Sequence, residues 1–391
     1  MKYDFDEVIE RRNTNSVKYD YTTKYFDTDD LIPMWVADMD FRTPDFIMEA
    51  IRERAGHEIL GYSVRPDSFF QAVINWYKDR QGWEIQRDWI LFSPGIVAAL
   101  SMAVRAYSNE GDKIIVQPPV YHPFFSVIKE NKRIPLYNPL LEKNGDYRMD
   151  FEGLKEKLDP SVKLLLLSHP HNPVGRVWSE DELDQLARIC IENNIIMLSD
   201  EIHSDLVFNP HRHKPLCTIG EEIAQNTITC VAPSKTFNLA GLSSSVVVIQ
   251  NEELRARFNH ELATGHLNMG NIFGSVALEA AYAKGHEWLD QLMEYLKGNL
   301  DLLGRFIESD LPGIRMYPAE ATYLAWLDMK DLGLKSKELR QFMIRNARIG
   351  CNDGPSFGPG GEGFQRLNFA CPRSVLQKAL AQLKDALEAR N

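Results

Sequence analysis

The chain has 391 residues, 44% of them apolar and 25% charged, which is the composition of a folded protein long enough for more than one domain. Its formal charge is −11 and it has no basic tract, which disfavours nucleic acids and anionic membranes as partners. Residues 1–16 lack the apolar core of a signal peptide, and no apolar run approaches the length of a membrane span. The five cysteines are scattered without a CxxC pair. We therefore expect a soluble, cytoplasmic protein.

Helical and strand-like segments alternate along the first part of the chain, from about residue 44 to 250. Helical spacing of apolar residues comes first, at 43–59 and at 65–82, where Gly82 ends the pattern. Short apolar runs then predict strands at 89–92, 113–117, 163–168, 194–200, 227–232 and 244–250. Between two of them, Ser179 and Glu182 have the spacing of a capping box at the start of a helix.

The rest of the chain is richer in helices. It predicts a long helix near 285–309, short strands within 321–329 and 366–370, and a final helix at 372–389. Buried strands that alternate with helices predict an α/β fold, with a mostly parallel central sheet covered by helices on both faces. A smaller α+β domain is expected to follow it. The expected bounds are 1–45 for an N-terminal segment joining the small domain, 46–285 for the large domain and 286–391 for the small domain.

Polar clusters follow several of the predicted strands. Ligands of open α/β sheets bind outside the carboxyl ends of the strands, so these clusters are candidates for a common site. In "FSPGIVAAL" the chain turns at Pro94 and Gly95 into a helix, whose first backbone N–H groups can bind an anion. The same pattern is also typical of an ordinary turn from a strand to a helix.

Two further clusters offer a ring and an amide. In "QPPVYHPF", Tyr121 and His122 follow two prolines, and the Tyr121 ring either stacks on a flat ligand or packs in the core. In "SHPHNPVG", Asn172 offers both a donor and an acceptor at a strand end. The histidines of this motif and of "HRH" at 211–213 have no carboxylate or cysteine at ligand spacing, so no metal site is expected.

A carboxylate and a lysine complete the set. Asp200, in "SDEIHSD", ends an apolar strand, where a carboxylate requires a cationic partner or a proton. Lys235, in "VAPSKTFNLAGL", follows another apolar run, and by itself it is more typical of a loop lysine that reaches solvent than of a buried nucleophile. Together the clusters match the phosphate, ring, phenolic oxygen, pyridine nitrogen and aldehyde of pyridoxal 5'-phosphate (PLP).

The motifs "NPVGR", "SDEIHSD", "SKTFNLAGL" and "RLNFACPR", in this order, resemble those of fold-type I PLP-dependent enzymes related to aspartate aminotransferase. Within that group the chain is most similar to the cystathionine β-lyases of the MalY/PatB type, and the resemblance covers essentially its whole length. It implies that the large domain binds PLP, that the substrate is a small molecule of the amino-acid class, and that the enzyme is a homodimer with active sites at the subunit interface.

The resemblance also implies a role for each matching residue. Lys235 corresponds to the Schiff-base lysine, Asp200 to the partner of the pyridine nitrogen, Asn172 to the partner of the phenolic oxygen, and Tyr121 to the stacking ring. The phosphate is expected to contact the backbone or hydroxyl groups of four residues, Gly95, Ile96, Val97 and Ser234.

The substrate and the second subunit account for the remaining assignments. Arg366 corresponds to the arginine that forks onto the substrate α-carboxylate, with Ala37 and Asp38 expected beside it. Tyr62, in "LGYSVRP", corresponds to the tyrosine that reaches the phosphate of the neighbouring subunit.

Three positions depart from the general aminotransferase pattern. Ala232 stands where Ser or Gly is usual, and Ser243 stands where an arginine usually binds the phosphate. His203 replaces the tyrosine that usually follows the aspartate and contacts the cofactor, and the β-lyase branch commonly carries histidine there. These departures favour the lyase branch over the transaminases.

The expected reaction is therefore β-elimination from L-cystathionine, cysteine or a cysteine S-conjugate, which yields a thiol, pyruvate and ammonia. Two alternatives remain open at this point. One is an aminotransferase that uses the same cofactor, because the fate of the substrate after Cα deprotonation has no direct sequence signature. The other is a protein of the same fold with an added regulatory binding role.

Overall fold

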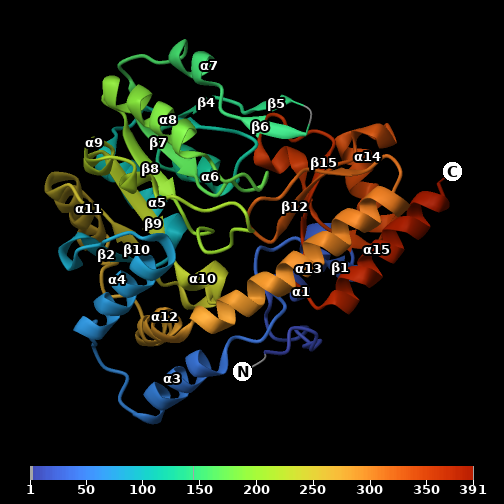
Figure 1. Cartoon of the computed structure of the whole chain (residues 1–391), viewed down its shortest axis with the longest axis horizontal. Coiled ribbons are helices and arrows are strands. Elements are labelled where there is room, and N and C mark those ends of the chain that lie inside the picture. Colours follow the sequence, from blue (N-terminus) through green and yellow to red (C-terminus); the bar gives the residue numbers. More distant parts are fainter. Residues whose placement is uncertain (1–2, 144, 391) are drawn as a thin grey trace.

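The computed structural model describes residues 3–143 and 145–390 and is built around a seven-stranded sheet (Figure 1). The strands lie in the order β2-β10-β9-β8-β7-β3-β4. Only β10 runs antiparallel to its neighbours, so the sheet is mostly parallel, as predicted. The bounds are β2 (Ile90–Ser93), β3 (Lys113–Val116), β4 (Ile134–Tyr137), β7 (Val162–Ser168), β8 (Ile196–Asp200), β9 (Thr227–Val231) and β10 (Ser245–Val248).

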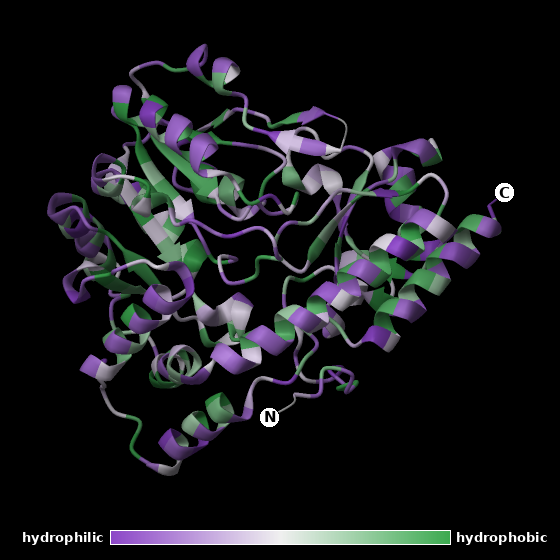
Figure 2. Ribbon diagram, in the orientation of Figure 1, coloured by the Kyte–Doolittle hydropathy of each residue, from purple (hydrophilic) through white to green (hydrophobic). Residues whose placement is uncertain are grey.

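Helices cover both faces of this sheet because successive strand residues point to opposite sides. In β3, Ile114 and Val116 belong to one buried apolar cluster and Ile115 to another. The first cluster includes α5 (Ile96–Tyr107), α6 (Pro123–Glu130) and α11 (Glu252–Thr264). The other side is covered by α3 (Asp45–Gly56), α4 (Asp67–Gln81), α7 (Phe151–Lys155), α8 (Glu180–Glu192), α9 (Glu221–Gln225) and α12 (Ile272–Lys284). Figure 2 shows hydrophobic strands at the centre and hydrophilic outer faces on the helices.

The local signals read from the sequence mark real boundaries. Helix α4 ends at Gly82, whose φ of 64° is a left-handed conformation that glycine adopts readily. The capping box of Ser179 and Glu182 is present at the start of α8. Strand β4 was missed because it is a partly exposed edge strand that contains Pro135, and proline is tolerated at sheet edges but weakens a strand pattern.

A second, antiparallel sheet has the strand order β11-β12-β15-β14. Its bounds are β11 (Arg315–Met316), β12 (Leu324–Asp328), β14 (Asn352–Asp353) and β15 (Phe364–Asn368). The long helix α13 (His286–Asp310) and the last helix α15 (Arg373–Glu388) pack against each other beside it (Figure 1). Other short elements include α10 (Pro233–Thr236), α14 (Ser336–Gln341) and the hairpin of β5 (Leu141–Lys143) and β6 (Asp146–Arg148). The residue bounds given above for the domains stay predictions.

The N-terminal segment contains α1 (Val17–Asp20), α2 (Thr22–Phe26) and β1 (Ile32–Pro33). Strand β1 pairs in parallel with β13 (Ile349–Gly350), so this segment lies against the C-terminal part of the chain. From β1 the chain runs through residues 35–41 to α3. In residues 3–143 and 145–390, no helix is both long and apolar enough to cross a membrane.

Candidate active site

The carboxyl ends of the parallel strands open onto a cavity of about 210 Å³. Ten predicted site residues line it: Ala37, Gly95, Ile96, Val97, Tyr121, Asn172, Asp200, His203, Ser234 and Lys235. Larger hollows exist elsewhere, such as one of about 950 Å³ beside Arg212 and Lys297, but it contains none of the predicted site residues. The small cavity is therefore the candidate site.

Lys235 lies in the wall of this cavity, on the short helix α10 that follows β9. Its Nζ atom donates a hydrogen bond to the backbone carbonyl of Ala37 at 2.6 Å. The hydroxyl of Tyr323 donates to the same oxygen at 2.9 Å. Burial lowers the pKa of Lys235 to about 8, although the nearby Asp38 carboxylate opposes that shift. A lysine of this kind is partly neutral near pH 7 and can act as a nucleophile or base.

Asp205 stabilises the turn that carries Lys235 by accepting hydrogen bonds. The Thr236 hydroxyl donates to Asp205 Oδ2 at 2.8 Å, and the indole N–H of Trp76 donates to Asp205 Oδ1 at 3.1 Å. Burial raises the pKa of Asp205 to about 6. The Asp205 carboxylate thus holds Thr236, the residue next to the lysine, and is itself held in place by the Trp76 indole.

Asp200 is the last residue of β8 and is buried. Burial raises the pKa of its carboxyl to about 7, while the Ile202 N–H, which donates to Oδ1 at 3.2 Å, acts in the opposite direction. Among the residues that the structure describes, no cation pairs directly with this carboxyl, and a protonated nitrogen in the cavity is a group that it can bind. Beside it, burial lowers the pKa of His203 well below the usual value, which leaves that imidazole neutral.

The opposite end of the cavity offers unpaired donors. Gly95 has a φ of +102° and begins α5, and its own N–H donates to the Ser93 carbonyl at 2.8 Å. The expected contact of the Gly95 N–H with a phosphate stays a prediction, and it would require that N–H to exchange the Ser93 carbonyl for the phosphate. The Ile96 and Val97 N–H groups remain, since the first amides of a helix have no acceptor within it. The buried Ser244 hydroxyl also has no partner among the described residues.

Arg366 lies just behind Asn172. Its Nη1 donates to Asn172 Oδ1 at 3.0 Å, and its Nη2 donates to the Trp35 carbonyl at 2.9 Å and to Asn352 Oδ1 at 2.6 Å. The residue is only 3% exposed, and all three acceptors are neutral. Its Nε has no partner in the described part of the chain. Burial lowers the pKa of Arg366 to about 10, so the guanidinium stays charged near pH 7. It has no anionic partner among the residues that the structure describes.

The family model for class I and II aminotransferases matches residues 29–383. The chain belongs to this family. It is 46% identical over 384 residues to cystathionine beta-lyase PatB of Bacillus subtilis (strain 168), covering 98% of this chain and 99% of that protein. It is 31% identical over 390 residues to Protein MalY of Escherichia coli (strain K12), covering 99% of each.

A solved structure of the PLP-bound C-S lyase from Staphylococcus hominis superposes with a TM-score of 0.92 and 38% identity. The match covers 99% of this chain and 98% of that chain. The resemblance to MalY/PatB-type enzymes and the fold-type I architecture are therefore confirmed.

The cavity of this class I/II aminotransferase family member fits PLP chemically. Ser244 and the first amides of α5 supply free donors for a phosphate, and Asp200 supplies the carboxyl for a pyridine nitrogen. Lys235 supplies the amine for an aldehyde. The hydroxyl run at 243–245 is the sequence signal that could have identified Ser244, which the motif analysis missed.

Three residues assigned from the family resemblance lie outside the cavity lining. Arg366 contacts it through Asn172, and Tyr62 is 96% exposed on the surface. The Asp38 carboxylate pairs with Arg11, with Nη2 and Oδ2 2.7 Å apart, and of these two neighbours only Ala37 lines the cavity. The expected place of Asp38 beside the substrate carboxylate stays a prediction.

The histidine pairs that raised the metal alternative have other bonds. His169 Nε2 contacts the Lys214 carbonyl at 3.0 Å, and His213 Nε2 contacts the buried Glu201 carboxylate at 2.8 Å. Within residues 3–143 and 145–390, no group of three or more His, Cys, Asp or Glu side chains is placed to hold a metal ion.

Proposed function

We propose that this protein is a PLP-dependent C–S β-lyase that cleaves L-cystathionine or a related cysteine S-conjugate to a thiol, pyruvate and ammonia. The observation that carries the proposal is a buried cation without an anion, Arg366, next to a cavity that holds Lys235 and Asp200. This set suits an amino-acid substrate. The preference for elimination over transamination is supported by the similarity to a cystathionine beta-lyase and by Ser243 and His203.

The cofactor contributes chemistry that side chains lack. When bound, PLP supplies an electrophilic carbonyl and a ring that stores the electron pair left when a substrate loses its Cα proton. The Ile96 and Val97 N–H groups and the Ser244 hydroxyl would hold its phosphate, and Asp200 and Asn172 would hold its ring, since all five residues line the cavity. Tyr121 lies in the same wall, where burial raises the pKa of its hydroxyl to about 12, so it stays neutral and presents an aromatic face.

Lys235 acts first as the base that accepts the substrate Cα proton and then as the acid that protonates the departing sulfur. Because its pKa is lowered to about 8, a fraction of the side chain is neutral near pH 7 and can accept the Cα proton at Nζ. The hydrogen bond to the Ala37 carbonyl holds that nitrogen in place and orients its lone pair. The resulting ammonium can then give a proton to the departing sulfur, so one group serves both steps.

Arg366 orients the substrate. A carboxylate that binds the guanidinium replaces its neutral acceptors with an anion, which strengthens the hydrogen bonds by charge. Since Arg366 also donates to Asn172, the substrate carboxylate and the cofactor ring are held by residues in direct contact. This contact limits rotation of the substrate relative to the base at Lys235.

We further propose that the enzyme acts as a homodimer in the cytoplasm. The segment around Tyr62 exposes Ile59, Leu60 and Val64, which are 72%, 62% and 89% exposed. Apolar side chains gathered in one exposed loop favour a protein interface. A dimer in solution, with Tyr62→Ala weakening cofactor binding, is the expected result, and a monomer with full activity contradicts it.

The decisive experiment is an absorbance titration of the purified protein with L-cystathionine, followed by assays for pyruvate and free thiol without any 2-oxo acid. Release of both products supports the lyase. Transfer of the amino group to an added 2-oxo acid without pyruvate supports the aminotransferase. Absence of bound cofactor from the purified protein, together with no uptake of added PLP, supports a binding role alone.

A further inference from the structure

Residues 35–41 form a segment whose backbone carbonyls accept hydrogen bonds from both Arg366 and Lys235. The Trp35 carbonyl accepts from Arg366 at 2.9 Å, and the Ala37 carbonyl accepts from Lys235 at 2.6 Å. At Met39 the segment is joined to Asn238: the Met39 N–H donates at 3.0 Å, and the Asn238 amide donates back to the Met39 carbonyl at 2.9 Å. The position of this segment therefore sets the position of the lysine nitrogen and of the guanidinium.

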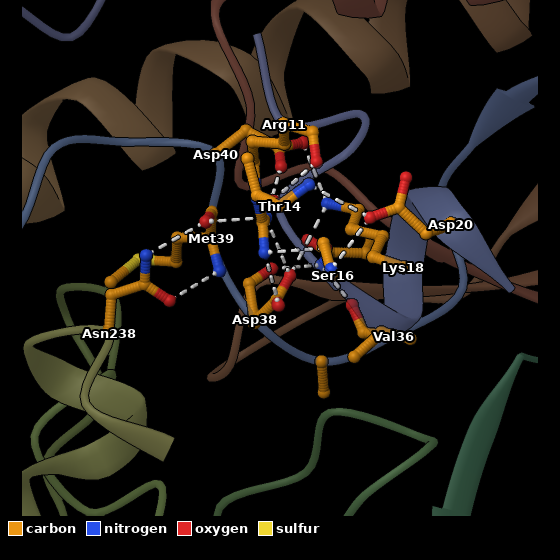
Figure 3. Close-up of polar contacts among 12 residues, drawn as sticks. Arg11, Thr14, Ser16, Lys18, Asp20, Val36, Asp38, Met39, Asp40 and Asn238 are labelled. Atoms are coloured by element: carbon orange, nitrogen blue, oxygen red, sulfur yellow. Dashed lines mark hydrogen bonds and ion pairs between the residues drawn. The ribbon is translucent and has the colours of Figure 1, made fainter. Parts of the chain in front are cut away.

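The 35–41 segment is anchored by a cluster of four charges (Figure 3). Arg11 donates to Asp38 Oδ2 at 2.7 Å and to Asp40 Oδ1 at 2.6 Å. Lys18 lies 2.7 Å from Asp40 Oδ2 and 3.8 Å from Asp38 Oδ1. Lys18 is 1% exposed and Asp40 is 6% exposed, so the two cations and two carboxylates balance each other largely away from solvent.

Hydrogen bonds within the loop that carries Arg11 help to fix the conformation of that loop. The Asp20 carboxylate accepts hydrogen bonds from the backbone N–H groups of Asn13, Thr14 and Ser16, at 2.8, 3.1 and 3.0 Å. The Ser16 hydroxyl then accepts from Arg11 Nη2 at 3.2 Å (Figure 3). These contacts restrict the Arg11 side chain before it meets Asp38 and Asp40, which lowers the entropy that its hydrogen bonds must overcome.

We propose that Arg11 is a positioning residue of the active site, which acts with Lys18 through the 35–41 segment to place the Ala37 carbonyl against Lys235. The inference rests on the proposed lyase function. It goes beyond the residues that touch substrate or cofactor, because Arg11 lines no part of the cavity. A displacement of the Ala37 carbonyl by a fraction of an ångström moves the acceptor that holds the lysine amine, and misplacement of a base on that scale slows proton transfer.

The test compares Arg11→Met, Arg11→Lys and Arg42→Met in the full-length enzyme loaded with PLP. Arg42 makes a matched control, because it pairs with Glu7 at 2.5 Å across the same part of the chain but is 58% exposed. We expect Arg11→Met to lower kcat for L-cystathionine about tenfold or more. Its cofactor absorbance should be retained, Arg11→Lys should restore part of kcat, and Arg42→Met should match the wild type.

The outcomes separate the inference from the function on which it rests. If the wild type releases no pyruvate, the proposed function fails. If the wild type is active and Arg11→Met keeps its kcat per bound cofactor, the inference fails. Should Arg11→Met not fold, Lys18→Met is measured in the same way, since it removes one cation and leaves Arg11 on both carboxylates. An equal kcat in folded Lys18→Met and Arg42→Met also overturns the inference.

Discussion

Arg366 and Asn172, 194 residues apart in the sequence, share a hydrogen bond of 3.0 Å from Nη1 to Oδ1. Arg366 lies within strand β15 of the smaller sheet, and Asn172 lies in the turn after β7 of the central sheet. The bond therefore crosses between the two sheets and joins the residue assigned to the substrate carboxylate with one assigned to the cofactor. A change in either is expected to affect both.

Replacing Arg366 with lysine should weaken substrate binding while the protein stays charged at this position. An ammonium cannot reach Asn172, Asn352 and the Trp35 carbonyl together, and it cannot fork onto a carboxylate. We expect KM for L-cystathionine to rise about 10–100-fold, which corresponds to the loss of one charge-assisted hydrogen bond. Steady-state kinetics measure it, and an unchanged KM contradicts the assignment.

Replacing Lys235 with alanine should abolish pyruvate release and the visible absorbance that depends on the lysine amine. Removal of a general base alone slows reactions by about 10²–10⁴-fold, and loss of the attachment point adds to that. Lys214→Ala is the matched control, because Lys214 is a partly exposed lysine close to the strand ends. Normal turnover by Lys235→Ala would contradict the assignment of Lys235 as the general base and the attachment point of the cofactor.

Replacing Ser244 with alanine should weaken PLP without harming the fold. The Ser244 hydroxyl is buried and has no partner in the described residues, so its removal costs the cofactor-free protein no hydrogen bond. Towards a phosphate it donates a charge-assisted bond, and we expect the Kd for PLP to rise about tenfold or more. Fluorescence titration of the cofactor-free protein measures Kd, and the midpoint of thermal unfolding serves as its control.

Replacing Asp200 with asparagine should change how the stability of the cofactor-free protein depends on pH. Burial raises the pKa of Asp200 from 3.8 to about 7, so the folded state binds its proton more tightly than the unfolded chain does. The contribution of Asp200 to the free energy of unfolding therefore falls as pH rises from about 4 to 7, and the substitution should change the slope of that free energy against pH by about one proton. Urea unfolding at several pH values measures how the free energy of unfolding depends on pH.

Other groups titrate in the same pH window and remain in that variant. Burial raises the pKa of Glu201 to about 7 and of Asp205 to about 6, so these carboxyls act in the same direction as Asp200. Buried histidines, whose pKa values are lowered, act in the opposite direction, so the test is the difference in slope between the variant and the wild type. Asp159→Asn is the opposite control, because hydrogen bonds from Lys113 and Ser161 lower the pKa of this exposed carboxyl to about 2. Its contribution is lost only as the pH falls from about 4 through 2. An identical slope in Asp200→Asn and wild type contradicts the prediction.

Most of the fold could be predicted from the sequence because it depends on local patterns. Apolar runs with turn residues marked the strands, and Gly82 marked the end of α4. The antiparallel direction of β10 was not predicted, because strand direction depends on how the connections pack and leaves no mark in a single apolar run. The exposed edge strand β4 was missed for the related reason that its pattern is weak.

The sequence by itself indicated most of the side chains that face the cavity at the ends of the parallel strands, because a residue that follows a parallel strand lies at that edge wherever the strand sits in the sheet. It did not indicate Ser244, which precedes the antiparallel strand β10. Only the tertiary structure decided that the Ala37 carbonyl holds Lys235, that Asp38 pairs with Arg11, and that the Ser244 hydroxyl stays unpaired. Every residue has a backbone carbonyl, so the sequence does not mark the one that contacts the lysine. A charge has no partner until segments distant in the sequence pack together, and here the N-terminal segment meets the lysine turn.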